Sequence, residues 1–462
     1  MRKVVLEGGR RLTQADLNRS AGALPPQIVE AAEKIVDDVR ARGDAAVREC
    51  CLRFDGACPD AFRVPDEALA RALDAVPAEF LAALTQARDQ IRDFHERERE
   101  QSWFTTRADG TLLGVQVTPV ASAAVYVPGG RAQYPSTVLM DTIPAKVAGV
   151  PRVVMVTPPQ KDGGLNPYTL AAAALAGVDE VYAVGGAQAV AAVAYGTESI
   201  PAVDKIVGPG NAYVAAAKRY VSGDVGIDMV AGPSEVCVLA DASADPVVVA
   251  ADLMAQAEHD PLASCYLVTC DPELPDRVLA AAERLVAQSP REEITRASLD
   301  DRGVIVVAEN LDAAVDAVNV VAPEHLELHC ADAMALLGRI RNAGAIFVGA
   351  WSSEPLGDYV AGPNHTLPTG GTARFSNPLG VYDFQKRSSV ICYTPEGLLA
   401  DAPAAQTLAQ SEGLWAHALS VGLRRRLAEG GTFDVDDVHR VAWPSDLQCA
   451  KRGQTPFDSS EV

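Results

Sequence analysis

A regular alternation of short apolar runs with helical segments constrains the fold of this chain more than any other feature. The apolar runs, such as VVMV and EVCVLAD, are not interrupted by alternating polar residues. Strands of this kind are typical of parallel sheets that helices cover on both faces. We expect strands at 112–127 (two strands), 153–156, 180–186, 204–210, 235–241, 264–270, 303–309 and 342–350, and helices at 165–177, 187–197, 211–221 and 246–259. A break near 231–234 separates two such series, so the sequence predicts an α/β protein with two doubly wound, Rossmann-like domains and parallel-rich sheets.

The segments before the alternation are predicted to be an arm and two helices. Residues 1–24 read as a short polar arm, and a helix opens at Pro25 with an apolar stripe behind it. A second long helix is predicted from Pro65 to about Glu100. Its end is a run of charged residues, so we expect His95 within that run to be exposed.

The segments after the alternation differ in composition. Residues 351–378 are rich in Gly, Pro, Thr and Asn, and a loop of this length inside a compact domain is usually functional. Residues 380–430 are again partly helical. The tail, 431–462, lacks clear periodicity, and we expect its end to be disordered.

Charge and cysteine usage limit the possible partners and compartment. The formal net charge is −21, with 61 acidic and 40 basic residues, and such a surface repels nucleic acid and anionic membranes. The N-terminal residues have no apolar signal segment, and no apolar run approaches the ~20 residues of a membrane span. The 9 cysteines are scattered without a C-x-x-C pair, which indicates free thiols in a reducing compartment. We therefore expect a cytoplasmic protein with neither nucleic-acid nor membrane partners.

The first candidate site residues end the helix AADLMAQAEHDP. Gln256 and His259 are three residues apart, so on a helix they share one face and could both reach a metal ion. The same pair could equally be a surface Gln and a capping His at the helix C-terminus, where a cation is favoured.

The second candidate is the stretch APEHLELHC. Glu324 and His325 are adjacent at a predicted loop-to-strand junction, where both side chains can reach one cavity. A His is a natural general base for an alcohol, and a carboxylate can activate water. The alternative is that Glu324 is a surface residue and that His325 is a polar residue whose hydrogen bonds are satisfied at the start of a strand.

The chain has only 7 histidines, and five of them lie in the two stretches above and in two further clusters. Asp358 and His365 lie in the long loop, although Asp358 could equally belong to a turn after Gly357. Glu412 and His417 lie in a helical segment, five residues apart, which does not place them on one face. Gln256, His259, Asp358 and His417 together would make a nitrogen and oxygen ligand set that suits zinc best, with iron, manganese or cobalt also conceivable.

Glycines mark two turns between a strand and a helix, VGGAQAV and VGPGNAY. Helix N-termini at such turns can bind a pyrophosphate through backbone N–H groups. Neither turn matches the G-x-G-x-x-G dinucleotide fingerprint, and tight turns that need Gly explain the pattern as well.

The chain resembles the histidinol dehydrogenase family over roughly residues 25–430. The resemblance rests on seven stretches in order: YVPGGRAQYPSTVLM, PAKVAGV, GGAQAVAAVAYGTESIPAVDKIVGPGN, DMVAGPSEVCVLAD, DLMAQAEHD, APEHLEL and GPNHTLPTGGTARFSNPLGVYDFQKRSSV. It implies oxidation of L-histidinol to L-histidine through the aldehyde, with two NAD molecules reduced, as the last steps of histidine biosynthesis.

The resemblance also implies roles for individual residues. It assigns one zinc ion per subunit to Gln256, His259, Asp358 and His417, where the ion would anchor the amino and imidazole nitrogens of the substrate. Ser234, Glu412 and His325 would also contact the substrate. His325 would be the base for the alcohol step, and Glu324 the base that activates water on the aldehyde. Tyr126, Gln188 and Asn211 match the NAD contacts of the family.

The family plan further implies an intertwined homodimer whose active site is shared between subunits. Residues 380–430 would cross to the partner, so that Glu412 and His417 complete its site. A discontinuous domain of 25–125 and 235–379 would carry the metal and catalytic residues, interrupted by an NAD-contacting domain of 126–234.

Three alternatives to this function remain open from the sequence. A relative on the same scaffold could oxidise another small alcohol. A zinc hydrolase could use Glu324 on a metal-bound water, without NAD. A non-catalytic protein could use zinc for stability alone.

Overall fold

The computed structural model describes residues 1–17, 24–129 and 133–442. The chain forms two compact units. The first contains Met1–Arg99 and Pro119–Gln385, and the second contains Glu100–Thr118 together with the chain from Lys386. The expected disorder at the end of the tail falls on 443–462, outside the described residues.

A five-stranded parallel sheet forms one half of the first unit, in the order β6-β5-β4-β7-β8. Its strands are β4 (Ser122–Tyr126), β5 (Arg152–Thr157), β6 (Glu180–Ala183), β7 (Lys205–Val207) and β8 (Gly226–Ile227). One face packs against α4 (Ala78–Glu96), α5 (Pro135–Ala148) and α6 (Pro167–Ala176). The other packs against α1 (Pro26–Arg42), α2 (Asp44–Cys50), α7 (Gly186–Tyr195) and α8 (Ala212–Val221). Because both faces are covered, the strands are apolar throughout, which is the pattern that predicted them.

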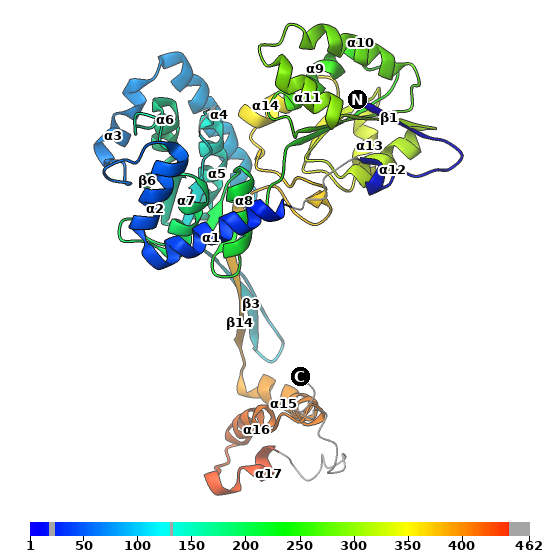
Figure 1. The fold of residues 1–462 in the computed structure, drawn as a ribbon. Helices are drawn as coiled ribbons and strands as arrows, with labels where there is room; N and C mark the ends of the chain where they lie inside the picture. The colour runs from blue at the N-terminus through cyan, green and yellow to red at the C-terminus, as the bar shows by residue number, and fades with distance from the viewer. Residues whose placement is uncertain (18–23, 130–132, 443–462) are drawn as a thin grey trace. The chain divides into compact units, whose positions relative to one another are not determined.

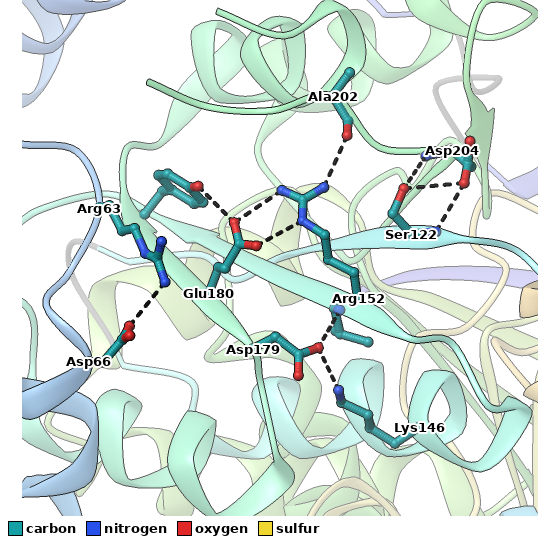
Figure 2. A network of polar contacts seen from close by, with 11 residues as sticks. Arg63, Asp66, Ser122, Lys146, Arg152, Asp179, Glu180, Ala202 and Asp204 are labelled. Atoms are coloured by element: carbon teal, nitrogen blue, oxygen red, sulfur yellow. Dashed lines mark hydrogen bonds and ion pairs between the residues drawn. The ribbon is translucent and has the colours of Figure 1, made fainter. Parts of the chain in front are cut away.

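Polar residues close the amino edge of this sheet (Figure 2). Arg152, at the start of β5, binds both oxygens of Glu180 at the start of β6, at 2.8 and 3.0 Å. Asp204 accepts hydrogen bonds from the backbone N–H and hydroxyl of Ser122, the first residue of β4. These contacts satisfy polar groups at the amino ends of the strands that would otherwise be unpaired. In open α/β sheets ligands bind at the opposite edge, outside the carboxyl ends of the strands.

A six-stranded parallel sheet forms the other half of the first unit, in the order β1-β11-β10-β9-β12-β13. Its strands are β1 (Arg2–Leu6), β9 (Glu235–Ala240), β10 (Ser264–Thr269), β11 (Val304–Ala308), β12 (His325–His329) and β13 (Ala345–Val348). Helices α9 (Pro246–Ala257), α10 (Leu274–Val286) and α11 (Glu292–Asp301) cover one face, where Figure 1 shows them together in green. Helices α12 (Leu311–Val321) and α13 (Ala333–Leu336) cover the other. The predicted class, doubly wound α/β with parallel-rich sheets, is confirmed.

The second unit combines a small sheet with helices. Its sheet has the order β14-β3-β2, from β2 (Trp103–Thr106), β3 (Leu112–Pro119) and β14 (Gln385–Cys392). Its helices are α15 (Pro395–Ser411), α16 (Trp415–Ala428) and α17 (His439–Ala442). The buried Gln406 amide donates to the carbonyl of Val441 at 2.8 Å and so joins α15 to the end of the described chain.

The remaining elements are short. They are α3 (Asp66–Ala70), α14 (Glu354–Tyr359), single helical turns at Gln14–Leu17, Ala72–Ala75, Leu337–Arg339, Thr372–Arg374, Val381–Phe384 and Val435–Asp437, and a π-turn at Cys51–Asp55. In the described part of the chain, no helix combines the length and apolarity that crossing a membrane requires.

Several local predictions were wrong. The predicted polar arm contains β1, whose five residues pair with β11 from Arg2↔Val304 to Leu6↔Ala308. The helix predicted from Pro65 to Glu100 is divided before Pro77, since α4 begins only at Ala78. His95 is buried rather than exposed, with its Nδ1 2.7 Å from Glu98 Oε2. The segment 380–430 is partly helical as expected, through α15 and α16, but the strand β14 precedes these helices, and the predicted long loop contains α14.

The packing also differs from the expected domain division. Helices α1, α2 and α4 were grouped with 235–379, but their buried residues contact the five-stranded sheet. The cysteines are free where described, but Cys392 is exposed and Cys58 and Cys270 are only partly buried.

A buried carboxyl on α5 supports a prediction about stability and pH. Asp141 Oδ1 accepts a hydrogen bond from Thr366 at 2.8 Å, Oδ2 has no hydrogen-bond partner among the described residues, and burial raises the pKa of Asp141 from 3.8 to about 8. The folded state therefore binds more protons than the unfolded state between these values, so this group lowers stability as pH rises from about 4 to about 8. In Asp141→Asn this pH dependence should disappear. As pH rises through this range, the free energy of unfolding of the variant should therefore increase relative to that of the wild type by up to about 1.4 kcal/mol per pH unit.

Urea unfolding midpoints at pH 5, 6, 7 and 8 would measure this difference. Asp60→Asn, which changes an exposed carboxyl, is the matched control and should follow the wild-type curve. Parallel curves for Asp141→Asn and the wild type would contradict the prediction.

Candidate active site

A cavity of about 450 Å³ lies between the two sheets of the first unit and contains most of the predicted site residues. Pro128 and Pro209, which line this cavity, follow the ends of β4 and β7 in the five-stranded sheet, whereas Ser234 and Glu324 directly precede β9 and β12. The cavity therefore lies between the carboxyl edge of one sheet and the amino edge of the other. Its lining includes Asn211, Ser234, Gln256, His259, Glu324, His325 and Asp358.

The end of α9 supplies two of these side chains. Gln256 is 1% exposed, and its Oε1 has no hydrogen-bond partner among the described residues. His259 follows the helix end, where its backbone N–H donates to the carbonyl of Gln256 at 3.2 Å. Protein atoms around the ring disfavour its charged form and lower the pKa of His259. A neutral imidazole and an unsatisfied amide oxygen are both able to donate to a cation.

The junction before β12 places Glu324 and His325 on the same cavity. Ala322, with φ 47°, is the one described non-glycine residue with positive φ, and it ends α12 directly before Pro323. Glu324 Oε2 accepts the N–H of Glu235 at 2.8 Å, and His325 Nδ1 lies 3.1 Å from the carbonyl of Glu235. Both side chains are thus held by the start of the neighbouring strand.

The contacts of His325 define which nitrogen can act as a base. A carbonyl oxygen only accepts, so in the neutral ring Nδ1 carries the proton and Nε2 carries the lone pair. Nε2 has no hydrogen bond among the described residues and lies 3.6 Å from Asp358 Oδ1. Burial opposes a charged ring, but the carboxylates of Glu354 and Glu324 outweigh it and raise the pKa of His325. The surroundings therefore stabilise the imidazolium that forms when the ring takes a proton.

Glu324 is prepared for proton transfer by burial. Its side chain is 7% exposed, and burial raises its pKa to about 8. An acid whose pKa lies near neutrality is an efficient general base at that pH.

Asp358 enters the cavity from the end of α14. Burial alone would raise its pKa, but the His325 ring, whose Nε2 lies 3.6 Å from Oδ1, lowers the pKa of Asp358 below its usual value, so this carboxylate is ionised. His365 braces the same segment, with Nδ1 2.9 Å from the carbonyl of Asp358 and Nε2 3.2 Å from Thr137 Oγ1. His365 also lines the cavity.

A second cavity of about 900 Å³ lies at the carboxyl edge of the five-stranded sheet and is lined by Tyr126, Gln188 and Asn211. The Tyr126 hydroxyl accepts the N–H of Gly186 at 3.0 Å, at the first turn of α7. Asn211 caps α8 by accepting from Tyr213 and Val214, and it lines both cavities. Gly208 has φ +109°, and a Cβ there would stand 2.3 Å from the carbonyl of Tyr126, so the strand-to-helix turn requires glycine.

Glu412 and His417 belong to the second unit. Glu412 follows the end of α15 and His417 lies in the first turn of α16, and both are exposed. The other site residues belong to the first unit, and the assignment of Glu412 and His417 to a site shared with a partner subunit stays a prediction.

The residues of the first cavity fit a zinc ion. Gln256 offers an unpartnered buried oxygen, His259 a neutral nitrogen, and Asp358 an ionised carboxylate. His nitrogen and carboxylate oxygen are common zinc ligands, the Gln oxygen is a less usual one, and the fourth predicted ligand, His417, lies in the second unit.

Sequence reasoning missed the buried acids around this cavity. Glu354 is 2% exposed and forms with His325 and Asp358 a group whose ligand atoms lie within 4.8 Å of one another. Glu327 and Asp252 are also buried, next to His329. A signal was present in HLELH, because residues two apart in a strand share a face.

The first unit thus contains two doubly wound sheets, a polar cavity between them and a larger cavity at a strand-to-helix edge, which is the arrangement expected of an α/β dehydrogenase. The profile of the family described as histidinol dehydrogenase matches residues 19–425. Among similar proteins, histidinol dehydrogenase of Bacillus licheniformis is 52% identical over 90% of this chain and 97% of its own length. The corresponding protein of Bacillus subtilis is 51% identical over 92% of this chain and 99% of its own. The crystal structure of histidinol dehydrogenase from Elizabethkingia anophelis has a TM-score of 0.87 at 33% identity, covering 93% of this chain and 99% of that one. The chain belongs to the histidinol dehydrogenase family.

Proposed function

We propose that this protein oxidises L-histidinol to L-histidine through L-histidinal, with reduction of two NAD, in histidine biosynthesis. One observation carries the proposal: Glu324 and His325, two bases of different chemistry, line one cavity with three donors suited to zinc. A two-step oxidation needs a base for the alcohol and a base for the water that adds to the aldehyde.

His325 serves the first step. Its Nε2 lone pair faces the cavity and takes the hydroxyl proton while the substrate carbon loses a hydride to NAD. Glu354 and Glu324 stabilise the resulting imidazolium. The Glu235 carbonyl holds Nδ1 throughout, so the ring keeps its orientation.

Glu324 serves the second step. Its carboxylate takes a proton from water as the water adds to the aldehyde, which gives the aldehyde hydrate as its monoanion, and this species loses the second hydride to NAD. The N–H of Glu235 fixes one carboxylate oxygen and leaves the other for water. Zinc held by Gln256, His259 and Asp358, with His417 of a partner subunit, would supply a fixed positive anchor for the amino and imidazole nitrogens of the substrate.

The NAD molecules are assigned to the larger cavity, beside Tyr126, Gln188 and Asn211. Gln188 is 2% exposed and its Nε2 has no hydrogen-bond partner among the described residues, so it has a donor to offer. Asn211 lies on both cavities, which gives a cofactor there a direct path to the substrate cavity.

Counting NADH per substrate consumed tests the function directly. With L-histidinol and NAD we expect two NADH per histidinol, loss of activity after chelation, and recovery with added zinc. One NADH, or activity only with other alcohols, would move the protein to a sister activity. Turnover of a hydrolysable substrate without NAD would support a zinc hydrolase, and zinc-dependent stability without redox activity a structural zinc protein.

A further inference from the structure

Two buried charges lie beside the turn that connects β7 to α8. Lys218 belongs to α8 and Asp228 directly follows β8, and their side chains are 2% and 1% exposed. Lys218 Nζ lies 2.5 Å from Asp228 Oδ1, so the two form an ion pair. Neither residue lines the substrate cavity or the larger cavity, so the chemistry described above gives the pair no role.

Both charges hold the backbone of one residue, Gly208. Lys218 Nζ donates to the carbonyl of Gly208 at 2.7 Å, and Asp228 Oδ2 accepts the N–H of Gly208 at 2.8 Å. Gly208 has φ +109°, a conformation that glycine adopts without strain but is equally free to leave. Contacts on both of its polar backbone groups therefore fix a turn that glycine alone would leave flexible.

The turn that begins at Gly208 borders both cavities. Pro209, Gly210 and Asn211 line the substrate cavity, and Asn211 also lines the larger cavity. Gly210 is a second glycine in this turn, where a Cβ would stand 2.4 Å from Val214. A turn with two glycines has many conformations when it is unrestrained, and a ligand that needs one of them must order the turn as it binds.

Asp228 also connects this turn to the wall of the substrate cavity. Its Oδ1 accepts the N–H of Met229 at 2.6 Å. From Met229 the chain continues towards β9, and residues 231–234 line the substrate cavity on the way. The ion pair thus joins the turn before α8 to the segment that carries Ser234.

Stability alone does not account for this buried pair. Both charges lose their hydration on burial, and apolar side chains of similar volume are often at least as stabilising as a buried ion pair. Burial raises the pKa of Asp141, another carboxyl close to Gly208, to about 8, so near neutral pH Asp228 is the carboxylate that balances Lys218. What the pair supplies is geometry, because it holds both polar backbone groups of a single glycine.

We propose that Lys218 and Asp228 are positioning residues that hold the turn 208–211 in the conformation that binds NAD, an inference that rests on the proposed function. The pair touches neither the cofactor nor the substrate. It keeps Asn211 at the boundary of the two cavities before NAD arrives, so that binding of the cofactor does not have to order the turn.

Lys218→Met in the zinc-loaded, full-length protein tests the proposal. Methionine has a similar length but cannot donate to the carbonyl of Gly208. The Kd for NADH, titrated by its fluorescence, and the KM for NAD should both rise about tenfold, while kcat at saturating NAD stays within about threefold of the wild type. A residue that acted only on stability would lower the amount of folded enzyme, and so the apparent kcat, but not the affinity for NADH.

Asp228→Asn has a matched control in Asp204→Asn. Both changes replace an Asp that accepts a backbone N–H at an edge of the five-stranded sheet, but Asp204 lies at the amino edge, beside Ser122 (Figure 2). Asp228→Asn converts one accepting oxygen into a donor, so it should weaken NADH binding. Asp204→Asn should leave the Kd for NADH unchanged.

The double variant Lys218→Met/Asp228→Asn serves if Lys218→Met does not fold, because it leaves no unpaired buried charge. It should still bind NADH about tenfold more weakly than the wild type, since it has no donor for the carbonyl of Gly208. If the wild type binds NADH and the folded Lys218→Met or double variant binds it equally well, the inference is overturned and the proposed function is not. A wild type that binds no NADH would instead overturn the proposed function itself.

Discussion

Glu324→Gln is expected to lower turnover of L-histidinal about 10²- to 10⁴-fold, and that of L-histidinol by a smaller factor at the first oxidation. The amide has the size of the carboxyl and can still accept the N–H of Glu235, which lies 2.8 Å away, so the side chain keeps its place. It cannot take a proton from water, so addition of water to the aldehyde slows. Initial rates with each substrate, and NADH per histidinol falling from two towards one, would measure the effect.

The matched control is His325→Gln, which removes the other base. It should show the opposite order, with the larger loss on L-histidinol, because the alcohol step needs the Nε2 lone pair. Equal losses on both substrates in Glu324→Gln would contradict the division of roles between these neighbours.

Mixing two inactive variants should restore activity if the site is shared between subunits. His325→Ala and His417→Ala each lack one group of every site in their own dimers. In a mixed dimer, one of the two sites combines an intact His325 with an intact His417 from the other subunit. With random exchange half of the dimers are mixed, so recovery should reach about a quarter of wild-type activity.

The second unit has the surface that such an arrangement requires. His417 is exposed on α16, and Leu414 and Trp415 beside it are 40% and 41% exposed. These side chains are therefore accessible to a partner subunit. As the control, His325→Ala mixed with Glu324→Gln should recover nothing, since both changes lie in the same half of the site. No recovery in demonstrated mixed dimers of the first pair would contradict the shared site.

The sequence was sufficient for most strands of the two large sheets because these strands are buried on two faces, whereas β1 and the two-residue β8 were not predicted. An apolar run such as EVCVLA needs no long-range information to be recognised, and all six of its residues are buried in β9. Adjacency alone brought Glu324 and His325 to one cavity. By contrast, Asp358 and Gln256 meet there because α14 and α9 pack on the same sheet. The family resemblance predicted that these two residues share a site, whereas the periodicity of the sequence did not.

The failures follow from contacts between distant segments. His95 sits in a charged run, yet its ring is buried against Glu98 and the amide of Asn364, 269 residues away. Helices α1 and α4 have ordinary apolar stripes, and such a stripe predicts that a helix is buried on one face but not which sheet it covers. The sequence HLELH indicates that Glu327 and His329 share one face of a strand. Only the position of Asp252 on α9 shows that they belong to a cluster.

The pairing of β1 with β11 has a consequence for the order in which the chain can acquire its structure. Leu6 lies opposite Ala308, so the first strand has no neighbour until some three hundred further residues have been synthesised. The five-stranded sheet uses only residues from 122 to 227 and can assemble while that neighbour is still missing. During translation β1 therefore remains an unpaired strand until β11 has been synthesised. A chaperone that shields β1 would act on the nascent chain rather than on the folded enzyme.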